Sequence, residues 1–386
     1  MSDPAVGWDP SRSAAGDRNP WLVAVVVSIA TFMVVLDTAI ANVSLRYIAG
    51  SLAASVDEST WVVTTYLIAN AVVLPASGWL SNVIGRKRFY MICVALFTGS
   101  SLLCGLAPSL SALIFFRILQ GLGGGGMPTS EQAILADTFP PQKRGQAFAL
   151  YGVAVIVAPT VGPTIGGWIT DNFSWHWIFF INVPIGLISL VLVHWLVDEP
   201  ETLERERHAR LAGGLKVDWI GLALIAITLG SLEVVLDRGQ IEDWFKSDTI
   251  IFFTALAAAS FLLFLPWEIN HEEPIVELRL LARRQFGMAF FVMLMVGAIL
   301  FGSNQIMPQL LQTTFPYTAM LSGLAMMPGG LAMLVLMPVA GQVTGRFQPK
   351  YLITFGLIGI ALSMWYSTTL TPMRASIILP GSGSLR

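Results

Sequence analysis

The sequence predicts an all-α protein that crosses a membrane many times. Of its 386 residues, 55% are hydrophobic and only 12% are charged, whereas a soluble domain carries about 25% charged residues. Long apolar runs recur along the chain, and each supplies roughly the 20 residues that a helix needs to span a bilayer. A transmembrane barrel is excluded, because its short strands alternate apolar and polar residues.

The apolar runs, separated by charged and Gly/Pro-rich interruptions, predict eleven spans. They are expected at residues 21–43, 61–80, 89–106, 110–135, 147–169, 175–197, 219–235, 250–267, 287–311, 319–341 and 351–369. Most lysines and arginines between the spans fall on one side of the membrane, whereas Arg46, Arg238 and Lys246 fall on the other. Because cytoplasmic loops carry the excess of Lys and Arg, we expect a cytoplasmic N-terminus with a polar tail at 1–20.

The longest polar stretch, 198–218, follows the sixth span. We interpret it as a cytoplasmic linker after a six-helix bundle at 21–197, although an ordinary solvated loop is equally consistent with its composition. A weak internal repeat supports the linker. Gly-rich turns that end in cations follow both the second and the tenth span, at 78–87 and 341–350, as in transporters built from two related halves.

Asp37 interrupts the first span and is the leading functional candidate. An acid at the centre of a membrane helix costs about 2.5–3.5 kcal/mol on insertion scales, so Asp37 should face protein or water. Counting about 1.5 Å per residue places Arg117 of the fourth span at a similar depth. Such a pair can bind and release a proton, because a nearby cation favours the ionised acid and burial disfavours it. A static ion pair that holds the helices together is the alternative.

Glycines and prolines mark two further spans. Gly121, Gly123 and Gly126 have the spacing of a dinucleotide fingerprint, but they lie inside an apolar helix rather than after a strand, so close helix packing explains them better. The fifth span contains Gly-Pro-Thr-Ile-Gly-Gly at 162–167. Its prolines favour a kink and its glycines give a smooth face, which suits a moving interface between domains.

Polar residues in other spans are secondary candidates. Gln305, Gln309 and Gln312 recur on one face of the ninth span. They should line a cavity, because lipid cannot satisfy them, although hydrogen bonding between helices is equally consistent with the pattern. Glu131 and Glu233 are expected near the ends of their spans, where acids reach water.

Composition and spacing exclude several classes of function. The net charge of −2 excludes a generally basic nucleic-acid binder. The four histidines and two cysteines lack metal-ligand spacing, so no metal site is expected. We find no nucleophile, base and orienting group in a catalytic arrangement, so the chain is not expected to be an enzyme.

Several motifs, in order along the chain, identify a family. They are Leu-Asp-Thr-Ala-Ile-Ala-Asn-Val at 36–43, Gly-Trp-Leu-Ser-Asn-Val-Ile-Gly-Arg-Lys at 78–87, Arg-Ile-Leu-Gln-Gly at 117–121, Gly-Pro-Thr-Ile-Gly-Gly at 162–167 and Trp-Ile-Phe-Phe-Ile-Asn-Val-Pro-Ile-Gly at 177–186. From about residue 20 to 369, the chain resembles the fourteen-span drug:proton antiporters of the major facilitator superfamily, the EmrB/QacA-type group. The resemblance implies that 219–267 is a pair of inserted helices and that 286–370 is a partial C-terminal bundle.

The resemblance also implies roles for single residues. Asp37 and Arg117 would couple transport to protons, and a cytoplasmic gate network would contain Gly78, Gly85, Arg86, Lys87 and Asp137. Gly162, Pro163, Gly166 and Gly167 would form the antiporter motif. We place Asn42 and Gln120 in the substrate cavity together with Gln305, Gln309 and Gln312. Asn82 stands where the loop motif usually has an acid, which puts a charge relay through that position in doubt.

Proton-coupled export of hydrophobic, drug-like compounds across the inner membrane by alternating access is the implied function. It needs the proton gradient and no cofactor. The implied partners are the small-molecule substrates, the lipid bilayer, and a periplasmic membrane-fusion adaptor with an outer-membrane channel. Family members continue for three more spans, whereas 371–386 contains no run long enough to cross, so we expect a truncated chain with an aberrant tail. A channel or facilitator for another small molecule, or a non-functional transporter fragment, is the alternative.

Overall fold

The fold is a bundle of long helices. The computed structural model describes residues 18–199, 204, 205, 207, 218–271, 274–313, 319–344 and 348–367, and this part of the chain contains helices and no strand. The long helices are α1 (Pro20–Ser51), α2 (Val56–Ile84), α3 (Arg86–Gly105), α4 (Leu110–Thr138), α5 (Pro141–Asn172), α7 (Asn182–Leu196), α9 (Trp219–Arg238), α10 (Asp248–Asn270), α11 (Arg284–Thr313), α12 (Ala319–Thr344) and α13 (Pro349–Ser367). Shorter turns are α6 (Trp177–Phe180), η2 (Trp244–Lys246) and η3 (Leu278–Ala282). The predicted all-α fold is confirmed.

Each predicted span overlaps one of these helices, except that the sixth is divided between α6 and α7. Within the described residues, eight helices are long and apolar enough to cross a membrane, counting α6 and α7 together as Trp177–Leu196. The remaining helices α11, α12 and α13 carry shorter apolar stretches, at Arg284–Ile299, Pro328–Val343 and Lys350–Tyr366. The chain is therefore a multi-pass membrane protein.

Local signals explain where several helices begin. Pro20 occupies the first turn of α1, and the Asn19 side chain accepts a hydrogen bond from the Trp21 N–H at 3.0 Å. Ser55 and Glu58 form a capping box at the start of α2. These side chains satisfy backbone N–H groups that have no partner inside the helix.

The predicted sixth span is interrupted once. It appears as α6 and α7, and Ile181 between them keeps α-helical dihedral angles, φ −59° and ψ −29°. Pro184 lacks an N–H group and cannot donate to a carbonyl in the preceding turn. The helical path therefore continues while its hydrogen-bond ladder is broken near Asn182.

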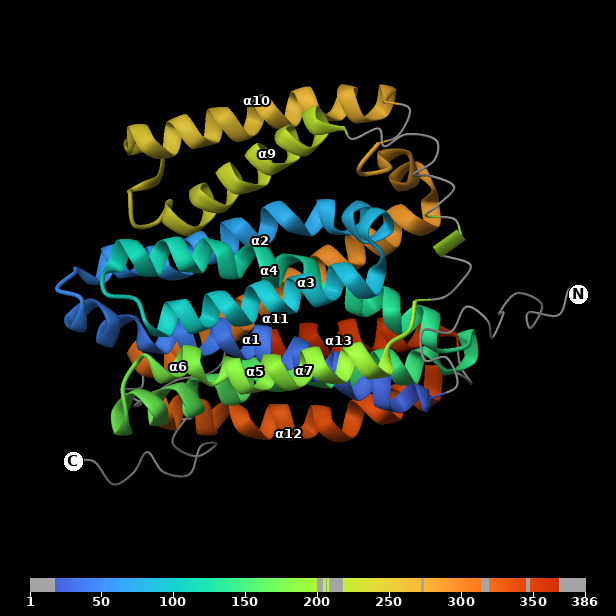
Figure 1. Ribbon diagram of the computed structural model, residues 1–386, viewed down its shortest axis with the longest axis horizontal. Helices are drawn as coiled ribbons and strands as arrows, with labels where there is room; N and C mark the ends of the chain where they lie inside the picture. The colour runs from blue at the N-terminus through green and yellow to red at the C-terminus, as the bar shows by residue number, and fades with distance from the viewer. Residues whose placement is uncertain are drawn as a thin grey trace, which may run out of the picture.

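The N-terminal helices pack in closely spaced pairs. Figure 1 shows them side by side with roughly parallel axes, and α4 packs against both α2 and α3. A Cβ atom on Gly123 would lie 2.7 Å from the Phe97 nitrogen, and one on Gly125 would lie 2.5 Å from the Asn70 carbonyl oxygen. The predicted role of the α4 glycines in close helix packing is confirmed.

Helix α5 lies between α1 and α12, and Figure 1 shows α12 along the edge of the bundle opposite α10. A Cβ atom on Gly162 would lie 2.6 Å from the Ala39 Cβ, and one on Gly166 would lie 2.8 Å from the Ile40 Cγ2. On the α12 side, a Cβ atom on Gly330 would lie 2.8 Å from the Thr160 Cγ2. Helix α5 therefore meets neighbours from both parts of the chain across small residues.

Helices α9 and α10 pack on each other, and α9 packs on α2 (Figure 1). The Arg238 guanidinium donates to the Thr60 hydroxyl at 2.7 Å and lies 4.9 Å from the Trp61 ring centroid. The Thr64 hydroxyl donates to the Asp237 carboxylate. These polar contacts join the end of α9 to the beginning of α2.

Some predicted segments fall partly or wholly outside the described residues. These include the N-terminal tail up to residue 17, most of the 198–218 linker, and the tail at 371–386. The linker residues Glu199 and Arg207 contact the α2–α3 junction. The predicted domain boundaries and the truncation remain predictions.

We predict that Gly123→Ala destabilises the protein by about 1–3 kcal/mol, because the added methyl group overlaps backbone atoms of α3. The matched control is Gly99→Ala, since a Cβ atom on Gly99 meets nothing within 4 Å. Thermal unfolding of the purified variants in detergent measures both. Equal melting temperatures for the two variants would contradict the packing argument.

Candidate proton-coupling site

Asp37 and Arg117 form an ion pair inside the bundle. The Arg117 Nη1 atom lies 2.5 Å from the Asp37 Oδ2 atom, and the two side chains are 0% and 1% exposed. Asp37 comes from the middle of α1 and Arg117 from the first third of α4. The expectation that they share a depth is confirmed.

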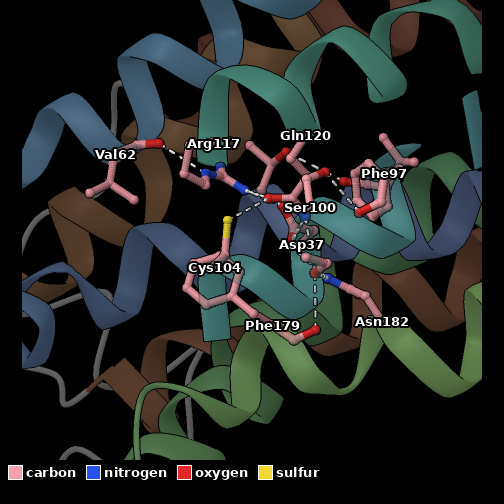
Figure 2. A network of polar contacts seen from close by, with 12 residues as sticks. Asp37, Val62, Phe97, Ser100, Cys104, Arg117, Gln120, Phe179 and Asn182 are labelled. Carbon is pink, nitrogen blue, oxygen red and sulfur yellow. Dashed lines mark hydrogen bonds and ion pairs between the residues drawn. The ribbon is translucent and has the colours of Figure 1, made fainter. Parts of the chain in front are cut away.

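Two amides complete the surroundings of the Asp37 carboxylate (Figure 2). Gln120 Nε2 and Asn182 Nδ2 donate to Asp37 Oδ1 at 3.0 and 2.7 Å. Both amides also donate to the Ser101 hydroxyl, at 3.2 and 3.0 Å. The three groups around Asp37 are all donors, so the site is arranged for an ionised carboxylate.

Arg117 has partners of its own besides Asp37. Its Nε atom donates to the Val62 carbonyl oxygen at 2.9 Å, and its Nη1 atom donates to Gln120 Oε1 at 2.8 Å. The guanidinium carbon lies 4.2 Å from the Tyr66 ring centroid and 5.7 Å from that of Phe179. These contacts stabilise the cation independently of the carboxylate.

Sequence reasoning did not assign Asn182, Ser101 or Tyr66 to this site. Asn182 was visible as an amide within an apolar run, inside a motif that helped to identify the family. Ser101 and Tyr66 carried no comparable signal. Whether these side chains face Asp37 depends on how α2, α3 and α7 are rotated about their axes. The hydropathy of the sequence does not determine this rotation.

Three of the predicted gate residues, Gly85, Arg86 and Lys87, lie at the junction of α2 and α3. Gly85 joins the helices with φ +102°, a conformation that favours glycine. Arg86 forms an ion pair with Asp137 of α4, and Lys87 Nζ donates to the His194 carbonyl oxygen at 2.8 Å. A Cβ atom on Gly78 would meet nothing within 4 Å.

Two residues of the 198–218 segment join this junction. Glu199 Oε1 accepts from the Arg86 N–H at 2.7 Å, and Arg207 Nη1 donates to the Ile84 carbonyl oxygen at 3.0 Å. Asn82, which replaces the usual acid, is exposed. A carboxylate from the segment after the sixth span therefore lies at the junction, which the sequence alone did not indicate.

The predicted substrate-cavity residues are not brought together by the described structure. Gln120 is fully buried beside Asp37, whereas Asn42 is exposed and donates to the Thr38 carbonyl oxygen at 3.2 Å. Gln305, Gln309 and Gln312 belong to α11, and their side chains lie outside the described part. Their place in a cavity remains a prediction.

One expectation about an acid is wrong. Glu131 was expected near the end of its span in reach of water, but it is 0% exposed. The Thr31 hydroxyl donates to its Oε2 atom, and the Tyr90 hydroxyl donates to its Oε1 atom at 3.2 Å. Glu131 lies near the end of its span, but α1 and α3 still cover α4 at this position and keep water away from the acid.

No metal centre is found in the described residues, where groups of three or more His, Cys, Asp or Glu side chains in a ligating arrangement are absent. The two cysteines, Cys93 and Cys104, are buried and free. The groups that meet at the Asp37 site are a carboxylate, a guanidinium, amides and a hydroxyl.

Comparisons with known proteins agree with this architecture. The model of the Major Facilitator Superfamily matches residues 27–382. The multidrug export protein EmrB of Haemophilus influenzae is 39% identical over 355 residues, which cover 91% of this chain and 68% of that protein. EmrB of Escherichia coli strain K12 is 38% identical over 352 residues, covering 91% of this chain and 67% of that protein.

The fold is also found among solved structures. A crystal structure of the peptide transporter POT in complex with sulfate matches 85% of this chain and 69% of that one, with a TM-score of 0.52 and 15% identity. Fold and sequence together define a multi-pass membrane transporter. The chain belongs to the major facilitator superfamily, and the resemblance to its EmrB/QacA-type multidrug exporters is confirmed.

We predict that Arg117→Ala destabilises the protein by about 3–5 kcal/mol, because it leaves the Asp37 carboxylate buried without a cation. The double variant Asp37→Asn/Arg117→Ala should recover part of this loss, since the amide carries no charge. Unfolding of the purified single and double variants measures the coupling. Additive effects of the two substitutions would show that the ion pair contributes nothing to stability.

Proposed function

We propose that this protein exports hydrophobic, drug-like compounds in exchange for protons by alternating access. The observation that supports it most is the buried Asp37–Arg117 pair with the Gln120 and Asn182 amides. Intramembrane acids of this kind mark proton and ion pathways. The EmrB relatives, both described as multidrug export proteins, give the class of substrate.

The exchange of a proton at Asp37 follows from the donors around it. An ionised carboxylate accepts from Arg117, Gln120 and Asn182, whereas a protonated acid has no charge with which to attract Arg117. Arg117 keeps its bond to the Val62 carbonyl and its contact with the Tyr66 ring. Protonation can therefore loosen α1 from α4 while the guanidinium stays solvated by protein groups.

Helix α5 supplies a surface on which such a change can act. Its glycine face contacts α1 beside Ala39 and Ile40, which lie two and three residues beyond Asp37. Its opposite side contacts α12 at Gly330. A shift of α1 would therefore be transmitted through α5 to the second part of the chain, where packed small residues permit sliding.

The wider setting follows from the same proposal. The excess of lysine and arginine on one side of the spans supports a cytoplasmic N-terminus, and the proposed location is the inner membrane. Hydrophobic small molecules are the substrates, and a periplasmic membrane-fusion adaptor with an outer-membrane channel would complete the export route. The energy source is the proton gradient, no cofactor takes part, and no chemical reaction is catalysed.

We predict that Asp37→Asn abolishes dye efflux driven by a pH gradient while membrane insertion remains normal. The amide has nearly the shape of the acid but cannot exchange a proton at neutral pH. Efflux of a fluorescent dye from cells or inverted vesicles, with and without an imposed pH gradient, measures the effect.

The matched control is Asp57→Asn, because Asp57 is an exposed acid at the start of α2. It should export dye at the wild-type rate. Gradient-driven efflux by Asp37→Asn at the wild-type rate would refute coupling at this residue. An ionic current that is independent of dye would instead favour a channel.

A further inference from the structure

Glu131 is a second acid buried in the N-terminal bundle, and the mechanism proposed above does not use it. It lies on α4, fourteen residues beyond Arg117, which corresponds to about 21 Å along the helix axis. Arg117 therefore cannot neutralise it. Its hydroxyl partner Thr31 lies six residues before Asp37 on α1, or about 9 Å along that axis. The two acids occupy separate sites in one bundle.

The surroundings of Glu131 contain no cation among the described residues. Its hydrogen-bond partners are the hydroxyls of Thr31 and Tyr90. The titratable groups that face it are Tyr90 and Cys93 of α3 and Tyr151 of α5, all of them neutral in their ordinary state. A fully buried carboxylate without a cation is strongly disfavoured relative to the neutral acid.

The hydrogen bonds around Thr31 accommodate both protonation states. The Thr31 hydroxyl has one hydrogen atom, and it lies near two acceptors, the Glu131 carboxyl group and the Val27 carbonyl oxygen at 3.3 Å. If Glu131 is protonated, it can donate to the Thr31 oxygen while Thr31 donates to Val27. If Glu131 is ionised, Thr31 can rotate its hydrogen toward the carboxylate. A proton can thus be gained or lost without leaving an unsatisfied bond.

We infer that Glu131 is a second proton-binding site of this protein, separate from the Asp37–Arg117 pair. It lies on the side of Asp37 toward Arg86 and Asp137, since Asp137 follows it by six residues on α4. The protein would then bind a proton at a charge-paired acid and another at an acid held by hydroxyls. Proton binding at Glu131 does not depend on the proposed function. The further claim that both protons are carried during export rests on it.

Infrared spectroscopy of the purified full chain tests proton binding without requiring transport. The wild type should show the carbonyl band of a buried protonated carboxylic acid at neutral pH, and Glu131→Gln should lack it. The band should persist in Asp37→Asn and in Glu277→Gln, a matched substitution at an exposed glutamate. The inference would be overturned if the folded wild type lacks the band. It would also be overturned if the band is unchanged in Glu131→Gln.

A second variant keeps the acid in place. Thr31→Val removes the hydroxyl that contacts Glu131 and preserves the shape of the side chain. The band should remain but change frequency, because the acid loses a hydrogen-bond partner. This variant decides the question if Glu131→Gln does not fold. Absence of any frequency change would contradict the assignment of the band to Glu131.

The number of protons exchanged per exported molecule tests transport. In proteoliposomes, with Nile red as the exported dye and a pH indicator inside, Glu131→Gln should halve the ratio of protons to dye relative to wild type. An unchanged ratio would overturn the claim that this proton is carried. If the wild type itself shows no coupled exchange, the proposed function fails, and the infrared result still decides whether Glu131 binds a proton.

Discussion

The structure of the N-terminal bundle depends on placing a guanidinium and a carboxylate in its interior. Each ion costs several kcal/mol to bury, and the cost is offset only where geometry and further hydrogen bonds are good. Four helices supply what is needed, because Asp37 comes from α1, Val62 and Tyr66 from α2, Arg117 and Gln120 from α4, and Asn182 from α7. The approach of α4 to α2 requires Gly121, where a Cβ atom would collide with the Tyr66 backbone carbonyl and with Ala69. The glycine run of α4 is thus a condition for the ion pair as well as a packing motif.

The sequence predicted the helices and the central pair because both follow from one-dimensional distances. Apolar length fixes which segments cross, and rise per residue fixes the depth at which Asp37 and Arg117 meet. Asn182 and Tyr66 were not assigned, because their roles depend on helix rotation and on the break near Pro184.

Glu131 was predicted to reach water because its depth was judged from its distance to the end of α4. Burial is decided by neighbouring helices, and α1 and α3 extend past Glu131 and cover it. The Gln305–Gln312 stripe shows the same limit, since its pattern alone does not distinguish a cavity from contacts between helices.

The gate junction illustrates how a departure from a family pattern can be compensated nearby. With Asn82 in place of an acid, the junction keeps the Arg86–Asp137 pair, and Glu199 brings another carboxylate to the Arg86 backbone. Gly85 with its positive φ allows this approach, because a Cβ atom there would collide with both Glu199 and Arg207. The segment after the sixth span therefore packs on the α2–α3 turn, so a substitution in either one should be interpreted together with the other.

The two buried acids differ in the charge of their partners, and this difference decides what a proton does at each. At Asp37 the surroundings carry a full positive charge, so adding a proton changes the net charge of the cluster from neutral to positive and weakens the attachment of α1 to α4. At Glu131 the partners are neutral hydroxyls, so adding a proton would remove a buried negative charge and favour the packing of α1, α3 and α4. In the proposed mechanism, protonation would thus have opposite effects on helix packing at two points of α1 about 9 Å apart. A proton that moves from Glu131 to Asp37 would weaken the contacts of α1 at both acids, and a proton that moves in the opposite direction would strengthen them. The bundle could therefore favour a different helix arrangement in each protonation state.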